Sequence, residues 1–113
     1  MEKIVERAML YDFYGQLLTE HQRTIYEDVV MNDMSLSEVA DEHGISRQGV
    51  HDLIKRCDST LISYEEKLKL LERFLLIKEQ MELLQDTAKN VTLSREALIE
   101  KIDNCTNIVL QEL

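Results

Sequence analysis

Apolar residues recur at steps of three and four along most of the chain, which predicts a succession of amphipathic helices. The first helix falls within residues 3–17. A capping box of Thr19 with Gln22 starts the second helix, and Asn32 with Asp33 ends it. The pattern therefore indicates helices with short connections.

The stretch from residue 35 to residue 61 predicts two helices joined by a tight turn. Ser35 with Glu38 has the spacing of a capping box. Gly44 follows the last periodic turn, where a positive φ is needed to end the helix and reverse the chain. Ser46 caps the second helix, whose apolar side chains share one face: Val50, Leu53, Ile54, Cys57 and Leu61. This spacing is typical of a helix-turn-helix, with the motif at residues 35–58.

The other face of the second helix is polar, and most of its side chains can form hydrogen bonds with base edges or phosphates. We predict DNA contacts there from Ser46, Arg47, Gln48, His51, Asp52, Lys55 and Arg56. The alternative is an ordinary solvated face, which any amphipathic helix has. The surrounding helix-turn-helix spacing favours the binding interpretation.

The segment after the motif predicts a long helix, since no Pro or Gly occurs between Ile54 and Leu84. We expect one helix from Ser46 or Arg47 to about Asp86, and a last helix, begun by Ser94, that folds back antiparallel. The predicted fold class is all-α: a helix-turn-helix, a long helix and a C-terminal helical hairpin. Residues 1–61 would form the N-terminal helical domain, and residues 62–113 an extension continuous with the recognition helix.

A second apolar stripe begins halfway along this long helix and needs a partner of its own. It predicts a homodimer interface formed by Leu70, Phe74, Ile77, Met81 and Leu84. The alternative is that the stripe packs on the N-terminal helix and that the protein stays monomeric.

Net charge bears directly on the DNA-binding interpretation. The 113 residues hold 13 Lys and Arg against 22 Asp and Glu, a net charge of −9. Contacts of Lys and Arg with phosphates supply most sequence-independent affinity for DNA. Binding to double-stranded DNA should therefore be weak per subunit and strongly salt-dependent, or require a dimer. The charge also favours an alternative function, an interaction module whose acidic surface meets a basic partner.

Other functional classes find little support in the sequence. No apolar run approaches the length of a membrane span, and the charged start is unlike a signal peptide, so we expect a cytoplasmic protein. Cys57 and Cys105 fall on apolar faces and should be reduced core thiols. The histidines show no metal-ligand spacing, and there is no phosphate-binding glycine loop or nucleophile elbow. We expect no cofactor, no metal and no enzymatic activity.

Residues 17–61 resemble the fourth-region helix-turn-helix of bacterial sigma factors. The shared features are a Leu-Thr-Glu-x-Gln opening, a Ser-Leu-x-Glu-Val-Ala first helix and a Ser-Arg-Gln start to the recognition helix. With its N-terminal helix, acidic balance and long helical tail, the whole chain is similar to the YlxM family, small bacterial proteins usually encoded beside the signal recognition particle genes.

The resemblance implies a DNA-binding regulatory protein with a role in the signal recognition particle pathway. Carried over by position, sigma-like contacts fall on Arg47, Gln48, His51 and Asp52. The alternative function becomes an acidic module that binds signal recognition particle protein or RNA without sequence-specific DNA binding.

Overall fold

The structure, a computed structural model, describes residues 2–113 and divides into two compact units at Lys69. The residues described are helical apart from short connections, which confirms the all-α class. The elements of the first unit are α1 (Lys3–Tyr14), η1 (Gly15–Leu17), α2 (Glu20–Tyr26), η2 (Glu27–Met31), α3 (Leu36–His43) and α4 (Arg47–Leu68). Those of the second are α5 (Leu70–Lys89) and α6 (Arg95–Glu112).

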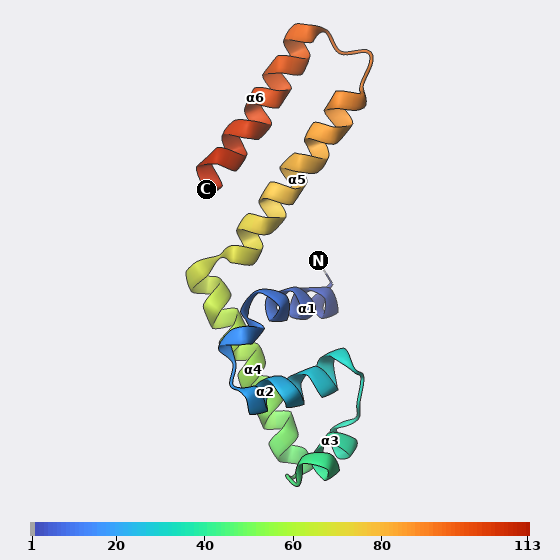
Figure 1. The fold of residues 1–113 in the computed structure, drawn as a ribbon, viewed down its shortest axis with the longest axis vertical. Coiled ribbons are helices and arrows are strands. Elements are labelled where there is room, and N and C mark those ends of the chain that lie inside the picture. The colour runs from blue at the N-terminus through green and yellow to red at the C-terminus, as the bar shows by residue number, and fades with distance from the viewer. Residues whose placement is uncertain (1) are drawn as a thin grey trace. The chain divides into compact units, whose positions relative to one another are not determined.

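Helix α4 is the centre of the first unit, because α1, α2 and α3 all pack on it (Figure 1). Its buried positions follow the apolar face predicted from the sequence, and the largest side chains without solvent exposure come from all four helices. They are Tyr14, Tyr26, Ile25, Leu61, Val39, Val50 and Cys57. Burial of each aliphatic side chain of this core contributes about 1.5–3 kcal/mol, so the core fixes which face of α4 is exposed.

Short-range signals in the sequence set the helix starts. The hydroxyl of Thr19 accepts from the Gln22 amide at 3.2 Å, and the Gln22 side chain accepts from the Thr19 amide at 3.0 Å, which confirms that capping box. Ser35 accepts from the Glu38 amide at 3.1 Å. Ser46 and Ser94 cap their helices in the same way. Each of these bonds satisfies a backbone donor that the helix itself leaves unpaired.

The expectation of one helix from the motif to residue 86 is wrong. Helix α4 ends at Leu68, and Lys69 takes a left-handed conformation with φ 56° and ψ 31°. The Lys69 amide donates to the Glu65 carbonyl at 2.8 Å, which closes the last turn of α4. A new helix starts at Leu70, so the C-terminal extension is not continuous with the recognition helix. The break occurs without Pro or Gly.

The second unit is the predicted antiparallel hairpin of α5 and α6 (Figure 1). Its buried side chains are Leu71, Gln80 and Cys105. Cys57 and Cys105 are both buried and unpaired thiols. Among residues 2–113, none of the helices combines the length with the apolar content that a membrane crossing requires.

Candidate nucleic-acid interface

The turn between α3 and α4 determines how the second motif helix is presented. Gly44 has φ 66° and ψ 31°, the left-handed conformation that its position predicts. The Ile45 amide then donates to the Ala40 carbonyl at 3.1 Å, which closes the end of α3. The chain reverses within two residues, and the Ser46 hydroxyl accepts from the Gly49 amide at 2.9 Å. The turn between α3 and α4 is therefore fixed at both ends by short-range bonds.

The seven residues predicted to contact DNA are brought together on the solvent-exposed face of α4 and at its cap. Each of Ser46, Arg47, Gln48, His51, Asp52, Lys55 and Arg56 is exposed. Among the described residues, Arg47, Lys55 and Arg56 have no ion-pair partner within the protein. Three cationic groups are thus available to an external anion.

Asp52 restrains its neighbours on the same face. The amide nitrogen of Gln48 donates to Asp52 Oδ1 at 2.9 Å, and His51 Nδ1 lies 3.7 Å from the same oxygen. The side chains of His51 and Asp52 are about half exposed, at 48% and 55%. The carboxylate therefore orients the Gln48 amide and adds a negative charge close to where a phosphate or base would lie.

The fold adds to this surface one residue that the sequence pattern did not indicate. Leu36, the first residue of α3, lines a shallow hollow of about 450 Å³ together with Arg47, Gln48 and His51. An apolar side chain beside two hydrogen-bonding ones matches the mixed chemistry of a major groove, where thymine presents a methyl group. Helical spacing could not identify Leu36, because it does not reveal contacts between the two motif helices.

A half-buried polar cluster holds α4 against α1 and α2. Arg7 Nε and Nη2 donate to the two carboxylate oxygens of Asp58 at 3.1 and 3.0 Å, and the Tyr26 hydroxyl donates to Asp58 Oδ1 at 2.6 Å. Burial and this hydrogen bond raise the pKa of Tyr26. The positive charge of Arg7 balances the negative charge of Asp58 at the end of the motif. Asp58 therefore adds little repulsion to the exposed face.

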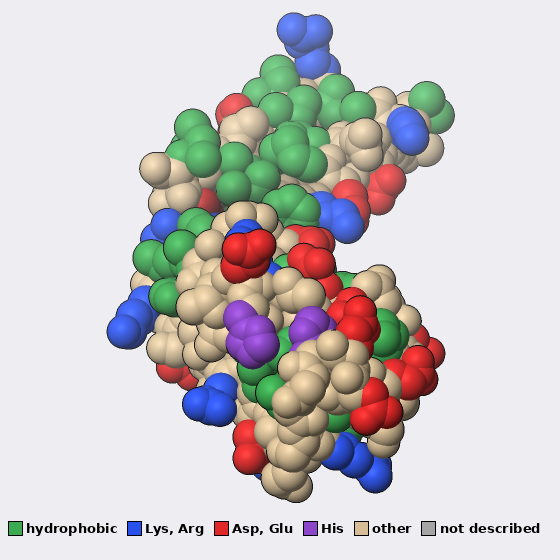
Figure 2. Space-filling view, turned by 60° about the horizontal axis from the view of Figure 1, so that its bottom comes forward, with side chains coloured by type: hydrophobic (Ala, Val, Ile, Leu, Met, Phe, Trp, Pro, Cys, Tyr) green, Lys and Arg blue, Asp and Glu red, His purple; other side chains and the backbone are tan. Residues whose placement is uncertain are grey.

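The charge distribution around the motif is uneven. Figure 2 shows acidic side chains gathered along one side of this face, whereas the Lys and Arg side chains lie apart from one another. There is no continuous basic patch in this view. Attraction to an anion would therefore come from single cationic side chains of α4 and not from a broad positive surface.

The predicted dimer residues lie on α5 and differ in exposure. Leu70, Phe74 and Met81 are exposed by 40%, 43% and 41%, while Ile77 and Leu84 are half-buried within the hairpin. Exposed apolar side chains also occur on α6: Ile99, Ile102, Ile108 and Leu110. The second unit therefore presents more apolar surface than its own two helices cover.

Comparison with known proteins agrees with this geometry. The family described as "Putative helix-turn-helix protein, YlxM / p13 like" matches residues 1–105. A UPF0122 protein of Clostridium botulinum is 41% identical over 108 residues, covering 92% of this chain and 99% of its own. One from Bacillus pumilus is 42% identical over 107 residues, 91% of this chain and 96% of its own. One from Acetivibrio thermocellus is 49% identical over 87 residues, 76% and 74% of the two chains.

Proposed function

Because the chain belongs to the UPF0122 family of helix-turn-helix proteins, we propose that it binds double-stranded DNA with the first turns of α4 in the major groove. The observation that carries the proposal is the first half of α4. Its cap and turn are fixed by the bonds of Ser46 and Gly44, its inner face is buried, and its outer face exposes Arg47, Gln48 and His51.

The side chains of this face suggest separate roles. Arg47 has the fork geometry that pairs with O6 and N7 of guanine, and Gln48 has the amide that pairs with adenine. Gln48 would have to exchange its bond with Asp52 for a base, so it discriminates bases less strongly than Arg47. Leu36 supplies an apolar contact for a thymine methyl group.

Lys55 and Arg56 lie about two turns beyond Arg47 and Gln48 along α4 and would contact phosphates. The Ser46 hydroxyl would lie beside the backbone at the helix start. The net charge of −9 opposes this attraction, so affinity per subunit should be low and fall steeply with salt. The proposed regulator therefore needs a second copy to hold a specific site.

We propose that this second copy binds through α5, with Phe74 and Met81 at the centre of the contact. Their exposure on a helix that already packs on α6 supports the proposal. A dimer would place two α4 helices on half-sites about 34–36 Å apart, or a multiple of that. Once one α4 helix is bound, the dimer would hold the second α4 helix near its half-site at a high effective concentration. Two weak contacts would then give a stronger complex.

The test is selection of bound fragments from a pool of genomic DNA by the purified protein, at roughly 50 and 150 mM salt, where phosphate-driven binding changes steeply. We expect a discrete site at the lower salt. Arg47→Ala should lose about 1–3 kcal/mol on that site and relax specificity at one base pair. Arg95→Ala, an equal charge change on α6, is the matched control and should keep the site.

Equal binding by wild type and Arg47→Ala would refute the recognition-helix assignment. No enrichment at either salt would refute DNA binding and leave the acidic surface as the functional one. The partner to test next would then be a basic protein or RNA of the signal recognition particle, the machinery that the family resemblance implies.

A further inference from the structure

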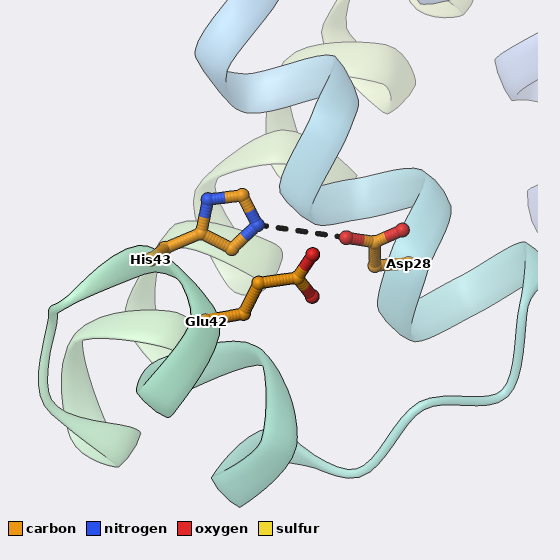
Figure 3. A group of neighbouring side chains, drawn as sticks. All are labelled: Asp28, Glu42 and His43. Carbon is orange, nitrogen blue, oxygen red and sulfur yellow. Dashed lines mark ion pairs between the residues drawn. The ribbon is translucent and has the colours of Figure 1, made fainter.

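A group of three side chains lies where η2 packs against α3, away from the exposed face of α4. Asp28 comes from η2, and Glu42 and His43 come from the last turn of α3 (Figure 3). One oxygen or nitrogen atom from each lies within 4.8 Å of the others. The sequence showed no metal-ligand spacing among its histidines, because Glu42 and His43 lie fourteen and fifteen residues from Asp28 and only the fold joins them.

The imidazole of His43 is the central observation. Its Nε2 atom is buried and has no hydrogen-bond partner. Asp28 Oδ2 lies 3.5 Å away, within ion-pair distance but beyond the normal range of a hydrogen bond (Figure 3). The side chains of His43 and Asp28 are each only 19% exposed. An unpartnered polar nitrogen in such a place costs free energy unless something binds it.

The surroundings hold both groups in position. Asn32 Nδ2 donates to Asp28 Oδ1 at 3.3 Å, which leaves Oδ2 directed at His43. The ring of His21 packs edge-on against the ring of His43 with centroids 6.3 Å apart. Outer contacts of this kind orient metal ligands in proteins. The exposed Glu42 carboxylate completes the group on a flexible side chain.

The distance between His43 Nε2 and Asp28 Oδ2 fits a shared cation better than a direct hydrogen bond. Two ligand atoms that each lie about 2.0–2.2 Å from a tetrahedral ion are roughly 3.4 Å apart, close to the 3.5 Å between His43 and Asp28. A divalent ion would also offset the repulsion between two neighbouring carboxylates. One imidazole with two carboxylates is a donor set suited to a first-row transition ion, and it leaves a position for water.

We infer that Asp28, Glu42 and His43 bind a divalent transition-metal ion, with Zn²⁺ the best fit. The ion would join η2 to α3 and so stabilise the first helix of the motif against the helix that precedes it. His43 would coordinate through the Nε2 lone pair, so a proton on that nitrogen leaves to solvent on binding, and no oxidation state changes. The site is independent of DNA binding and can be measured without DNA.

The first experiment titrates Zn²⁺ into metal-free, tag-free full-length protein by calorimetry. We expect one ion per chain, and a Kd raised by more than about tenfold in Glu42→Gln, which removes one ligand from an exposed position and should leave the fold intact. Asp41→Asn is the matched control, an exposed carboxylate beside Glu42 that is not part of the group. It should bind as wild type does.

Two further readouts separate this site from zinc held by thiols. Co²⁺ loaded in place of Zn²⁺ should give a visible spectrum without thiolate charge-transfer bands, since neither cysteine belongs to the group. Zn²⁺ should raise the thermal midpoint of wild type and Asp41→Asn but not that of Glu42→Gln or His43→Gln. Equal binding by Glu42→Gln and wild type, thiolate bands, or no binding by wild type would each overturn the inference.

Discussion

The part-buried hydrogen bond from Tyr26 to Asp58 is the contact whose loss the structure predicts most sharply. Tyr26→Phe removes the hydroxyl and keeps the ring, which is fully buried. A hydrogen bond to a charged group contributes about 1.5–3 kcal/mol. Asp58 keeps its two bonds from Arg7, so no carboxylate is left unpaired and the loss should lie at the lower limit. We expect the first unit to lose about 1.5 kcal/mol of unfolding free energy.

Urea unfolding followed by tyrosine fluorescence measures this loss in the first unit, which contains all of the tyrosines. The chain has no Trp, and its four tyrosines, Tyr11, Tyr14, Tyr26 and Tyr64, all precede Lys69. With a slope of about 1 kcal/mol/M for so small a unit, the midpoint should fall by roughly 1.5 M. The slope itself should stay constant, because the compactness of the unfolded state does not change.

Tyr11→Phe is the matched control for this measurement. The Tyr11 hydroxyl also donates to a carboxylate, that of Glu27, but at the surface. Water replaces such a bond readily, so the variant should lose no more than about 0.5 kcal/mol. Its ring still stacks on Tyr26, with centroids 5.4 Å apart. Equal losses in the two variants would show that the bond from Tyr26 to Asp58 stabilises the fold no more than a surface bond does.

Three further predictions follow from the same structure. Burial and the bond to Glu27 raise the pKa of Tyr11 to about 12, and the pKa of Tyr26 is raised as well, so both favour the folded state while protonated. Stability should be complete below about pH 10 and fall as the pH rises toward 12, seen as a falling urea midpoint; a constant midpoint would contradict this. Gly44→Ala should cost about 1–2 kcal/mol because φ is 66°, although a Cβ meets no atom within 4 Å; an unchanged midpoint would show that the turn relaxes freely. Phe74→Glu with Met81→Glu should reduce the sedimenting mass from dimer to monomer, and an unchanged mass would refute the α5 interface.

Much of the motif could be predicted from the sequence because short-range interactions determine it. Helix starts at Thr19, Ser35 and Ser46 depend on a hydroxyl and an amide three residues away, and Gly44 depends on its own backbone. The exposed position of Arg47 follows from helical periodicity once the buried face is known. These features need no knowledge of the rest of the fold.

The break at Lys69 shows where local reasoning fails. Every residue around it favours a helix, and a left-handed lysine costs about 1–2 kcal/mol. Burial of one leucine contributes about as much or more, and Leu71, two residues later, is only 5% exposed. Helix propensity is therefore too weak to fix the boundary, which depends on how separate segments pack.

Contacts between distant residues were decided by the tertiary structure alone. Arg7 and Asp58 are 51 positions apart, and their pairing arises because α1 crosses α4 at that height. Asp28 meets His43 for the same kind of reason, and Leu36 joins Arg47 across the turn. Sequence periodicity determined which face of each helix is apolar. The packing of those faces decided which polar side chains meet, because that depends on the angle and offset between helices, which periodicity does not encode.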